Sequence, residues 1–592
     1  MRTRLRLVGI RDAPLAPAHR PGTAVPGERR ERKTFMILIH RNSTRPPLRA
    51  VGAAFCALMA VSLCLAQNRV DVYKDGVSVG FRSSINAAYR DLVPNPLNGH
   101  YLLVVAPGTY NQTNGRTGIR LDKVTPPPYT LTLRAATPGT VWLGGVGSTK
   151  VFDRIMVTAD SDRVTIDGFN ISGATRSGIF VEAPSPDGTG VDDAIIRNCF
   201  ITGQYSGSSG MTNGILLAGG RIDRRPNFSS NRITNVNIGM WLGSGQGDVD
   251  NYGRAEHNVI YNLTGQDPAT AGGIVVWASQ TSVSVRADRW EISNNTIYDP
   301  KGPGIWVQAN VSTTLSYQAT HINARNNIIW TTRSGDPAIK QDLATTTGNP
   351  GVPYLDSSDF NNFHVTAGAP VGSWNGVSRP TLADWQVASG GKDANSLSAD
   401  PLFANVPGGD FHLRSQGGRF TSSGLPFVID ASSSPSIDAG RVDSLLYVPE
   451  TYPDGGRVNQ GAYGGTAEAS RTYVQQKNSM GDVVLVGGIT SPAAIVIEAR
   501  AAYALPPGLP TPNVRIQVEV KPVGTAFDGA TGLFQSNLLT GGTVGSAAVS
   551  GLAPSQEYHW RYRTVNGSSG AVSDWESFGG NAESAADFRT PQ

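Results

Sequence analysis

The sequence predicts an all-β fold, in which a long parallel β-solenoid is followed by a small β-sandwich. Two short motifs alternate along residues 164–330 at a shared interval of about thirty residues, which is the signature of a repeat protein. Each copy consists of short β-branched or aromatic runs bounded by Gly, Asn, Asp and Pro, a pattern typical of strands and turns. The copies lack the helical spacing that ankyrin or tetratricopeptide repeats require, so those classes are excluded.

The first motif is a polar turn residue, any residue and then an apolar residue. Its copies are Asp167-Gly-Phe169, Asn198-Cys-Phe200, Asn231-Arg-Ile233, Asn258-Val-Ile260, Asn295-Thr-Ile297 and Asn327-Ile-Ile329. Their apolar residues are 31, 33, 27, 37 and 32 positions apart. The second motif is a glycine followed by an apolar run, which starts at Gly178, Gly214, Gly239, Gly273 and Gly304. A single copy cannot bury its apolar face, so stacked copies must share one core.

The recurring asparagine suits the corner of such a coil. Asparagine tolerates left-handed backbone, and its side-chain amide can hydrogen-bond the coil above or below. Two alignments of this row remain open, because Asn294 and Asn326 compete with Asn295 and Asn327.

These motifs closely resemble the repeat of right-handed parallel β-helices in pectin-lyase-like secreted proteins. The resemblance implies that residues 67–470 form such a β-helix. Lyases, hydrolases, epimerases, phage tailspikes and adhesins share this architecture, so the resemblance does not specify a reaction.

Both ends of the solenoid carry recognisable segments. A helix-compatible stretch over 84–90 precedes a buried strand that ends in Ala106-Pro-Gly-Thr-Tyr110, which resembles an N-terminal cap and first coil. We expect less regular final coils over 334–425 and the end of the solenoid near Ser470. Residues 480–592 change to Val, Ala, Thr and Pro-Gly turns, which predicts a β-sandwich. Residues 551–560 resemble the tyrosine-corner region of a fibronectin type III domain.

Residues 1–66 are expected to be an N-terminal extension and a secretory signal. Arg41, Arg45 and Arg49 precede an apolar run from Val51 to Leu65, which ends at Ala66. This order of basic, apolar and small residues predicts export. The run is short for a membrane span. We therefore expect an extracellular or periplasmic bacterial protein, in the medium or at the cell surface, with no stable membrane span after cleavage.

Charge and cysteine content narrow the possible partners. Residues 1–66 hold 12 of the 50 Lys and Arg residues and 3 of the 46 Asp and Glu residues. The remainder has 38 basic and 43 acidic residues, so its net charge is −5. This balance argues against nucleic-acid binding. Only Cys199 lies beyond the leader, and we expect it to be a core residue of a protein without disulfides.

Strand alternation predicts a row of outward aromatic side chains. If Ile179 and its equivalents point inward, their neighbours point outward. The outward aromatic residues are Phe180, Trp241, Trp277 and Trp306. Such a row requires a cover, which is either a glycan stacked on the rings or a loop or domain of the protein itself.

The connections that follow these strands are polar and are expected to form one rim of a groove. Arg221, Arg224 and Arg225 would suit the carboxylates of a uronate-containing polysaccharide. Ordinary solvated loops would have the same composition. Oxygen ligands for Ca²⁺ could come from two sets of acidic residues, namely Asp187, Asp192 and Asp193, or Asp248 and Asp250.

Catalytic residues are not marked by a motif. Elimination from a polyuronate needs a base for the C5 proton and a group that neutralises the carboxylate. His257, Lys301 and Arg254 are candidates of suitable chemistry. Hydrolysis would instead need two carboxylates across the groove.

Three functional hypotheses follow, one of which is a purely structural solenoid, against which the outward aromatic residues argue. The first is a secreted, monomeric polysaccharide-binding protein that cleaves or epimerises an acidic glycan along the groove, as a lyase-like or epimerase-like enzyme. The alternative is a non-catalytic surface or matrix adhesion protein that binds glycan or protein partners, which the fibronectin-like domain favours.

Overall fold

The computed structural model describes residues 68–592 with internal gaps. The gaps are 112–116, 145–150, 159–160, 183–190, 204–211, 219–224, 244, 247–251, 268–269, 279–284, 310–316, 344–354, 422–426, 442–449, 451–457, 483, 485–486, 491–493, 502–512, 542, 574 and 579–583. The expected leader, residues 1–66, lies outside the described part. No helix in the described part has the length and apolarity that crossing a membrane requires.

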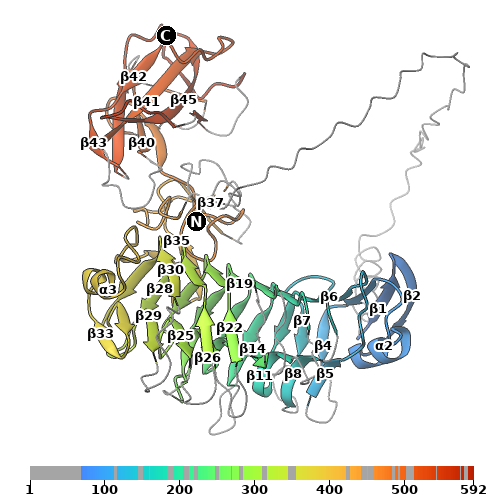
Figure 1. Cartoon of the computed structure of the whole chain (residues 1–592). Helices are drawn as coiled ribbons and strands as arrows, with labels where there is room; N and C mark the ends of the chain where they lie inside the picture. The colour runs from blue at the N-terminus through green and yellow to red at the C-terminus, as the bar shows by residue number, and fades with distance from the viewer. Residues whose placement is uncertain are drawn as a thin grey trace, which may run out of the picture. The chain divides into compact units, whose positions relative to one another are not determined.

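The described chain is all-β except for two short helices, and successive strands enter three long sheets in a repeating order (Figure 1). Sheet A contains β2 (Val77–Arg82), β1 (Val70–Lys74), β3 (Tyr101–Val105), β6 (Leu131–Ala135), β9 (Val164–Asp167), β12 (Ile195–Arg197), β15 (Asn227–Ser229), β19 (Gly253–Glu256), β23 (Trp290–Ser293), β27 (Ile322–Arg325) and β30 (Leu355–Asp359). From β3 onward its strands are parallel.

The other two long sheets repeat the same order. Sheet B contains β31 (Asn362–Val365), β28 (Ile328–Thr331), β24 (Thr296–Tyr298), β20 (Val259–Tyr261), β16 (Arg232–Thr234), β13 (Phe200–Thr202), β10 (Phe169–Ile171), β7 (Val141–Leu143) and β4 (Gly108–Tyr110). Sheet C contains β33 (Val377–Arg379), β32 (Gly372–Trp374), β29 (Ile339–Leu343), β25 (Ile305–Ala309), β21 (Gly272–Ala278), β17 (Ile238–Gly243), β14 (Asn213–Ala218), β11 (Ala174–Glu182), β8 (Val151–Val157) and β5 (Thr117–Leu121). These long parallel sheets are consistent with a β-helix.

A smaller sheet lies between sheets C and A in chain order. It contains β18 (Gly245–Gln246), β22 (Val285–Asp288) and β26 (Tyr317–Thr320). Each of these strands follows a strand of sheet C and precedes one of sheet A.

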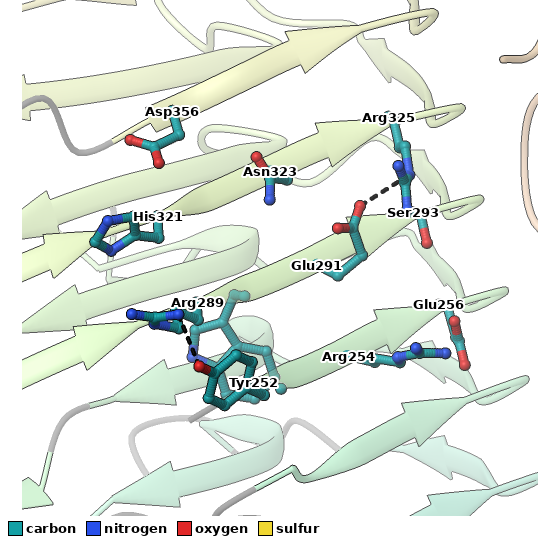
Figure 2. Close-up of a pocket in the computed structure, with 12 residues that line it drawn as sticks. Tyr252, Arg254, Glu256, Arg289, Glu291, Ser293, His321, Asn323, Arg325 and Asp356 are labelled. Carbon is teal, nitrogen blue, oxygen red and sulfur yellow. Dashed lines mark hydrogen bonds and ion pairs between the residues drawn. The ribbon is translucent and has the colours of Figure 1, made fainter. Parts of the chain in front are cut away.

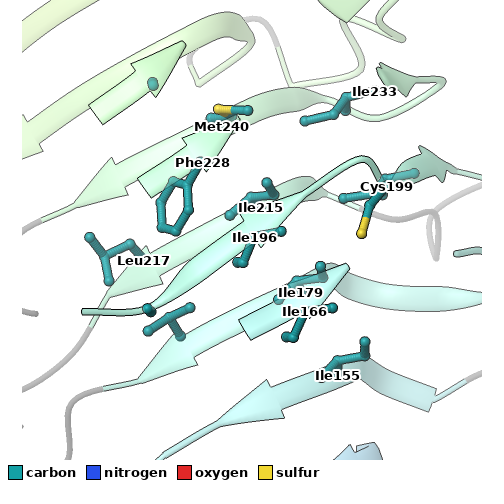
Figure 3. Close-up of a cluster of buried hydrophobic side chains, with 14 of the residues drawn as sticks. Ile155, Ile166, Ile179, Ile196, Cys199, Ile215, Leu217, Phe228, Ile233 and Met240 are labelled. Atoms are coloured by element: carbon teal, nitrogen blue, oxygen red, sulfur yellow. The ribbon is translucent and has the colours of Figure 1, made fainter. Parts of the chain in front are cut away.

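Apolar side chains from all three sheets fill the interior of the solenoid (Figure 3). The inward row of sheet C is in register and fully buried, and it consists of Ile179, Ile215, Met240, Ile274 and Ile305. The predicted orientation of this strand is therefore confirmed. The two sequence motifs also meet here. A Cβ at Gly239 would lie 2.5 Å from the carbonyl oxygen of Gly273 and 2.6 Å from Ile260 Cγ2, so only glycine fits.

A ladder of buried asparagines joins the coils at the corner between sheets A and B. Its members are Asn231, Asn258, Asn295, Asn327 and Asn361. Each Nδ2 donates to the Oδ1 of the next at 3.0 Å. The residue before each ladder position takes the left-handed backbone, with φ of 53° at Asn294 and 56° at Asn326. The left-handed corner and the side-chain hydrogen bond, both expected of one asparagine, thus fall on consecutive residues. Asn294 and Asn326 belong to the row of corners, and Asn295 and Asn327 belong to the ladder, so each of the two open alignments describes a row in the structure.

The repeat alignment was wrong in its first two copies. Ile201 pairs with both Ile233 and Ile171 in sheet B, so the second copy is displaced by one residue and the first by two. The reason is that apolar residues replace asparagine at the ladder position of these coils. One of them is Cys199, whose backbone N–H donates to Asn231 Oδ1 at 3.1 Å. Cys199 is a buried free thiol, as predicted, and burial raises its pKa to about 12.

Helices close the two ends of the parallel region. At the start, α2 (Ile85–Leu92) has Ser84 as its N-cap and buries Ile85, Ala88 and Tyr89, which confirms the predicted cap. At the end, α3 (Leu382–Ala388) buries Trp385, and this helix was not predicted. Parallel pairing continues as far as Trp374, so the coils after 334 are more regular than expected.

Described residues of the segment 400–470 cover the outer face of sheet B. This segment contains two hairpins, formed by β34 (Phe403–Asn405) with β35 (Asp410–Leu413) and by β36 (Arg419–Phe420) with β37 (Phe427–Val428). Phe411 packs against Tyr261 and Tyr298, with ring centroids 5.2 and 5.7 Å away. The aromatic outer face of sheet B is therefore part of a second core.

The C-terminal part has two further sheets that share one apolar core. The three-stranded sheet contains β38 (Val474–Lys477), β40 (Ile495–Arg500) and β44 (Val544–Val549). The seven-stranded sheet contains β39 (Gly488–Ile489), β47 (Phe588–Arg589), β45 (Glu557–Asn566), β41 (Asn513–Pro522), β42 (Leu533–Gln535), β43 (Leu539–Thr540) and β46 (Glu576–Ser577). Nearly all of their pairings are antiparallel.

Substitution of Asn295 by alanine tests the ladder. The change leaves the backbone N–H and Nδ2 of Asn258 and the carbonyl of Ala255 without their partner. Each unsatisfied buried group costs about 1–3 kcal/mol, so we expect a loss of at least ~3 kcal/mol in the free energy of unfolding. Chemical denaturation of Asn295→Ala measures it. The control is Asn227→Ala, because Asn227 faces outward and its side chain makes one hydrogen bond, to Glu256. Equal losses in both variants would refute a special role for the ladder.

Candidate functional site

The residue that leads into each strand of sheet A has left-handed backbone on six consecutive coils. These residues are Arg163, Asp193, Arg225, Tyr252, Arg289 and His321, with φ between 50° and 62°. Non-glycine residues rarely adopt this conformation, and a tyrosine in it is unusual. The column of corner residues runs along one side of sheet A.

The outward side chains of sheet A form two polar columns. The first is Asn227, Arg254, Glu291, Asn323 and Ser357, and the second is Ser229, Glu256, Ser293, Arg325 and Asp359. Alternation puts apolar residues such as Phe228 and Ile292 on the inner side, where they are fully buried. The outer face of sheet A is thus polar, whereas that of sheet B is aromatic.

A cavity of about 390 Å³ opens on this polar face, over β19, β23, β27 and β30 (Figure 2). Its lining residues are Tyr252, Gly253, Arg254, Glu256, Arg289, Trp290, Glu291, Ser293, His321, Asn323, Arg325 and Asp356. The indole ring of Trp290 packs directly against the backbone of Gly253, so closely that a Cβ at Gly253 would lie 2.6 Å from the ring. This contact supports the floor of the cavity. The cavity therefore combines corner residues, both polar columns and a rigid floor.

Charged groups of both signs face the cavity. Arg325 Nε lies 2.9 Å from Glu291 Oε1, and Arg289 Nη1 donates to the Tyr252 hydroxyl at 2.7 Å. Burial raises the pKa of Glu291 above its ordinary value, although Arg325 and Arg254 act in the opposite direction. The guanidinium of Arg254 is exposed and has no hydrogen-bond or ion-pair partner among the described residues. This free cation beside carboxylate and amide acceptors suits a ligand that carries both a carboxylate and hydroxyl groups.

Sequence reasoning found one of these residues, Arg254, but not the others. Glu291, Arg325 and Asp356 lie on three different coils, and Arg325 follows Glu291 by 34 positions in the chain. A usable signal was present, because the strands β19, β23 and β27 before the asparagine corners alternate polar or charged residues with apolar ones.

The predicted row of outward side chains on sheet C exists. Phe180, Leu216, Trp241, Val275 and Trp306 are in register. Trp277 pairs with Gly243 and stacks on Trp241, with ring centroids 4.8 Å apart and planes 15° apart. Trp306 lies against Trp277 on one side and beneath Lys340 Nζ, at 4.1 Å, on the other. Phe180 is buried beneath the guanidinium of Arg176.

These contacts occupy the ring faces that a sugar would need. Trp306 is buried and Trp241 and Trp277 are half-buried, because the indoles stack on one another along the solenoid. The row therefore has a stabilising role within sheet C, and glycan binding by these tryptophans stays a prediction.

Substitution of Trp277 by alanine distinguishes the two roles. Loss of the central ring of the stack should lower the free energy of unfolding by about 2 kcal/mol. Affinity for a glycan should change by less than about twofold. Trp142→Ala is a control for stability, since Trp142 faces outward on sheet B and has one ring neighbour, Phe200 at 6.2 Å. A tenfold loss of affinity in Trp277→Ala would instead assign glycan binding to sheet C.

The predicted loop residues are only partly described. Arg221, Arg224, Asp187, Asp248 and Asp250 lie outside the described residues. Arg225 and Asp193 form an ion pair at 2.8 Å between neighbouring coils. The backbone N–H of Asp192 donates to Asp162 Oδ1 at 2.7 Å. In the described part of the chain no three His, Cys, Asp or Glu side chains are placed to hold a metal ion together. The calcium site stays a prediction.

The remaining catalytic candidates lie away from the cavity. His257 occupies a left-handed corner after β19, and its Nδ1 lies 3.2 Å from the carbonyl oxygen of Ala462 in the segment that covers sheet B. Lys301 lies between sheets B and C, where its Nζ is 2.6 Å from Asp299 Oδ2. Of the three candidates, only Arg254 lines the cavity.

Acidification should destabilise the fold around His257, because protonation places a charge on a buried imidazole. Burial lowers the pKa of His257 below 6.5, although Glu256 acts in the opposite direction. The lowered pKa contributes stability that is present above pH 6.5 and is lost as the pH falls through the folded-state value. We expect the melting temperature of wild type to fall more between pH 7.5 and 5 than that of His257→Asn, which keeps a residue that tolerates left-handed backbone. Equal falls would contradict this assignment.

The comparisons with known proteins add no family. No family model matches this chain, and no curated protein sequence matches it either.

Proposed function

We propose that this protein is an extracellular polysaccharide-binding protein that holds an acidic glycan in the cavity on sheet A. The observation that carries the proposal is the exposed guanidinium of Arg254 in a cavity lined mainly by polar and charged side chains of both signs. A guanidinium pairs with a carboxylate through two parallel hydrogen bonds, which a neutral sugar cannot form. The carboxylates of Glu256 and Asp356 are acceptors for sugar hydroxyls.

The size of the cavity agrees with this proposal. Ligand sites commonly enclose about 300–1,000 Å³, and the cavity of about 390 Å³ is within this range. It spans four consecutive strands of one sheet, so its long direction follows the stacking of the coils. A linear polymer fits such a site better than a compact small molecule does.

The finer assignments of fold and location belong to the same proposal. The motif resemblance supports a right-handed β-helix for residues 67–470. A fibronectin type III-like domain over 480–592 is supported by Tyr558, whose hydroxyl accepts a hydrogen bond from the backbone N–H of Ala553 at 2.8 Å, as in a tyrosine corner. The signal-like residues 41–66 support export.

Glu291 would transfer protons in an enzymatic form of this function. Its buried carboxyl group with a raised pKa is suited to general acid or base chemistry. The ion pair with Arg325 occupies the same carboxylate, and this favours the alternative of a binding protein without turnover. Cleavage or epimerisation and plain adhesion therefore share the binding site and differ in what Glu291 does.

Substitution of Arg254 by alanine tests the proposal. Loss of a charge-assisted pair should weaken binding of oligogalacturonate at least tenfold in isothermal titration calorimetry, with stability unchanged. The control is Arg134→Ala, because Arg134 is an exposed residue of β6 on the same sheet but outside the cavity.

Activity is measured on the same samples. Pectic, alginate and glycosaminoglycan polymers are followed by ultraviolet absorbance of unsaturated uronates and by new reducing ends, with calcium or chelator. Binding without either product supports the adhesion alternative. Unchanged affinity in Arg254→Ala would reject the cavity as the binding site.

A further inference from the structure

The backbone of Tyr252 is strained at an exposed position. Its φ is 50°, yet 53% of the residue is accessible to solvent. The same corner is left-handed on five other coils, so the conformation belongs to the fold, but a bulky residue in it costs on the order of 1–3 kcal/mol. Glycine or asparagine would occupy this corner at lower cost. Burial of the tyrosine ring in a core therefore does not explain its presence.

The surroundings of Tyr252 place an aromatic ring at one end of the cavity. The Arg289 guanidinium lies over the ring, 4.8 Å from its centroid, and also donates to the hydroxyl. These two contacts fix the orientation of the ring while leaving much of it exposed. Arg254 follows two residues later on the same coil, so an aromatic surface and an exposed cation line the same cavity (Figure 2).

The spacing of the coils suits a polysaccharide that runs along the solenoid. Neighbouring strands of a sheet are about 4.8 Å apart, which is comparable with the length of one pyranose residue. From β19 to β30 the cavity crosses three such steps, or about 14 Å. Asp356 lies at the far end of this path, opposite Tyr252.

We propose that Tyr252 is the stacking platform for the first sugar of a three-residue uronate segment, which lies along sheet A from Tyr252 to Asp356. The apolar C–H face of that sugar rests on the phenol ring and its carboxylate pairs with Arg254. The next two residues follow the coils past Glu291 and Asn323 to Asp356. This inference rests on the proposed function and adds the length and direction of the ligand.

The test uses galacturonate oligomers of one to six residues in isothermal titration calorimetry. Affinity should rise with each residue up to the trimer and change by less than twofold beyond it. Tyr252→Asn should bind the trimer at least tenfold more weakly, while its melting temperature stays equal or rises because asparagine relieves the backbone strain. Tyr252→Phe keeps the ring and should stay within about threefold of wild type.

The outcomes separate this inference from the proposed function. Wild-type affinity in Tyr252→Asn, together with weak binding in Arg254→Ala, would overturn the platform and leave the proposed function standing. A lower melting temperature in Tyr252→Asn would mean that the tyrosine is structural, which also overturns the inference. Affinity that still rises from trimer to hexamer would reject the three-residue length. Failure of wild type to bind any oligomer would reject the proposed function itself.

Discussion

The hydrogen bonds between successive corner asparagines are the constraint on which the rest of the solenoid depends. Each buried amide satisfies both the backbone and the side chain of the neighbouring coil, as Asn295 does for Asn258. A coil that slipped by one residue would leave several buried polar groups unpaired, at about 1–3 kcal/mol each. The ladder thereby fixes the register of the coils from Asn231 to Asn361. Because register is fixed, outward residues far apart in the chain form continuous columns, and the cavity is built from such columns.

The sequence was informative where one local pattern had one structural explanation. A glycine before an apolar run predicted which side chains of sheet C point inward, since the missing Cβ is required by contact with the next glycine and with an isoleucine of sheet B. The same reasoning failed in the first two copies of the asparagine motif. There Cys199 and Phe169 take the ladder position, so an alignment anchored on polar residues had to shift. The role of asparagine at the ladder position was predicted correctly. Its replacement there by an apolar residue was not anticipated.

The site was harder to predict, for two physical reasons. Equivalent cavity residues on neighbouring coils are separated by more than thirty positions in the chain, and their pairing depends on loop lengths that vary between coils. In addition, alternation shows that a side chain faces outward but not whether its surface is already occupied. Trp241 and Trp277 were correctly placed outside the core, yet each covers the other. Tyr252, an exposed aromatic residue at the cavity, was overlooked because it occupies a corner and not a strand.

The three outer faces of the described solenoid explain why the binding site is expected on sheet A. An apolar outer face must be covered, and sheets B and C meet this requirement in different ways. The segment over 400–470 buries the aromatic residues of sheet B, and stacked indoles with Lys340 shield those of sheet C. Sheet A needs no such cover, because its outward columns are polar and can remain hydrated. A polar face can therefore stay open to a polar ligand, and in the proposed function the exposed guanidinium of Arg254 is the group that would pair with a carboxylate.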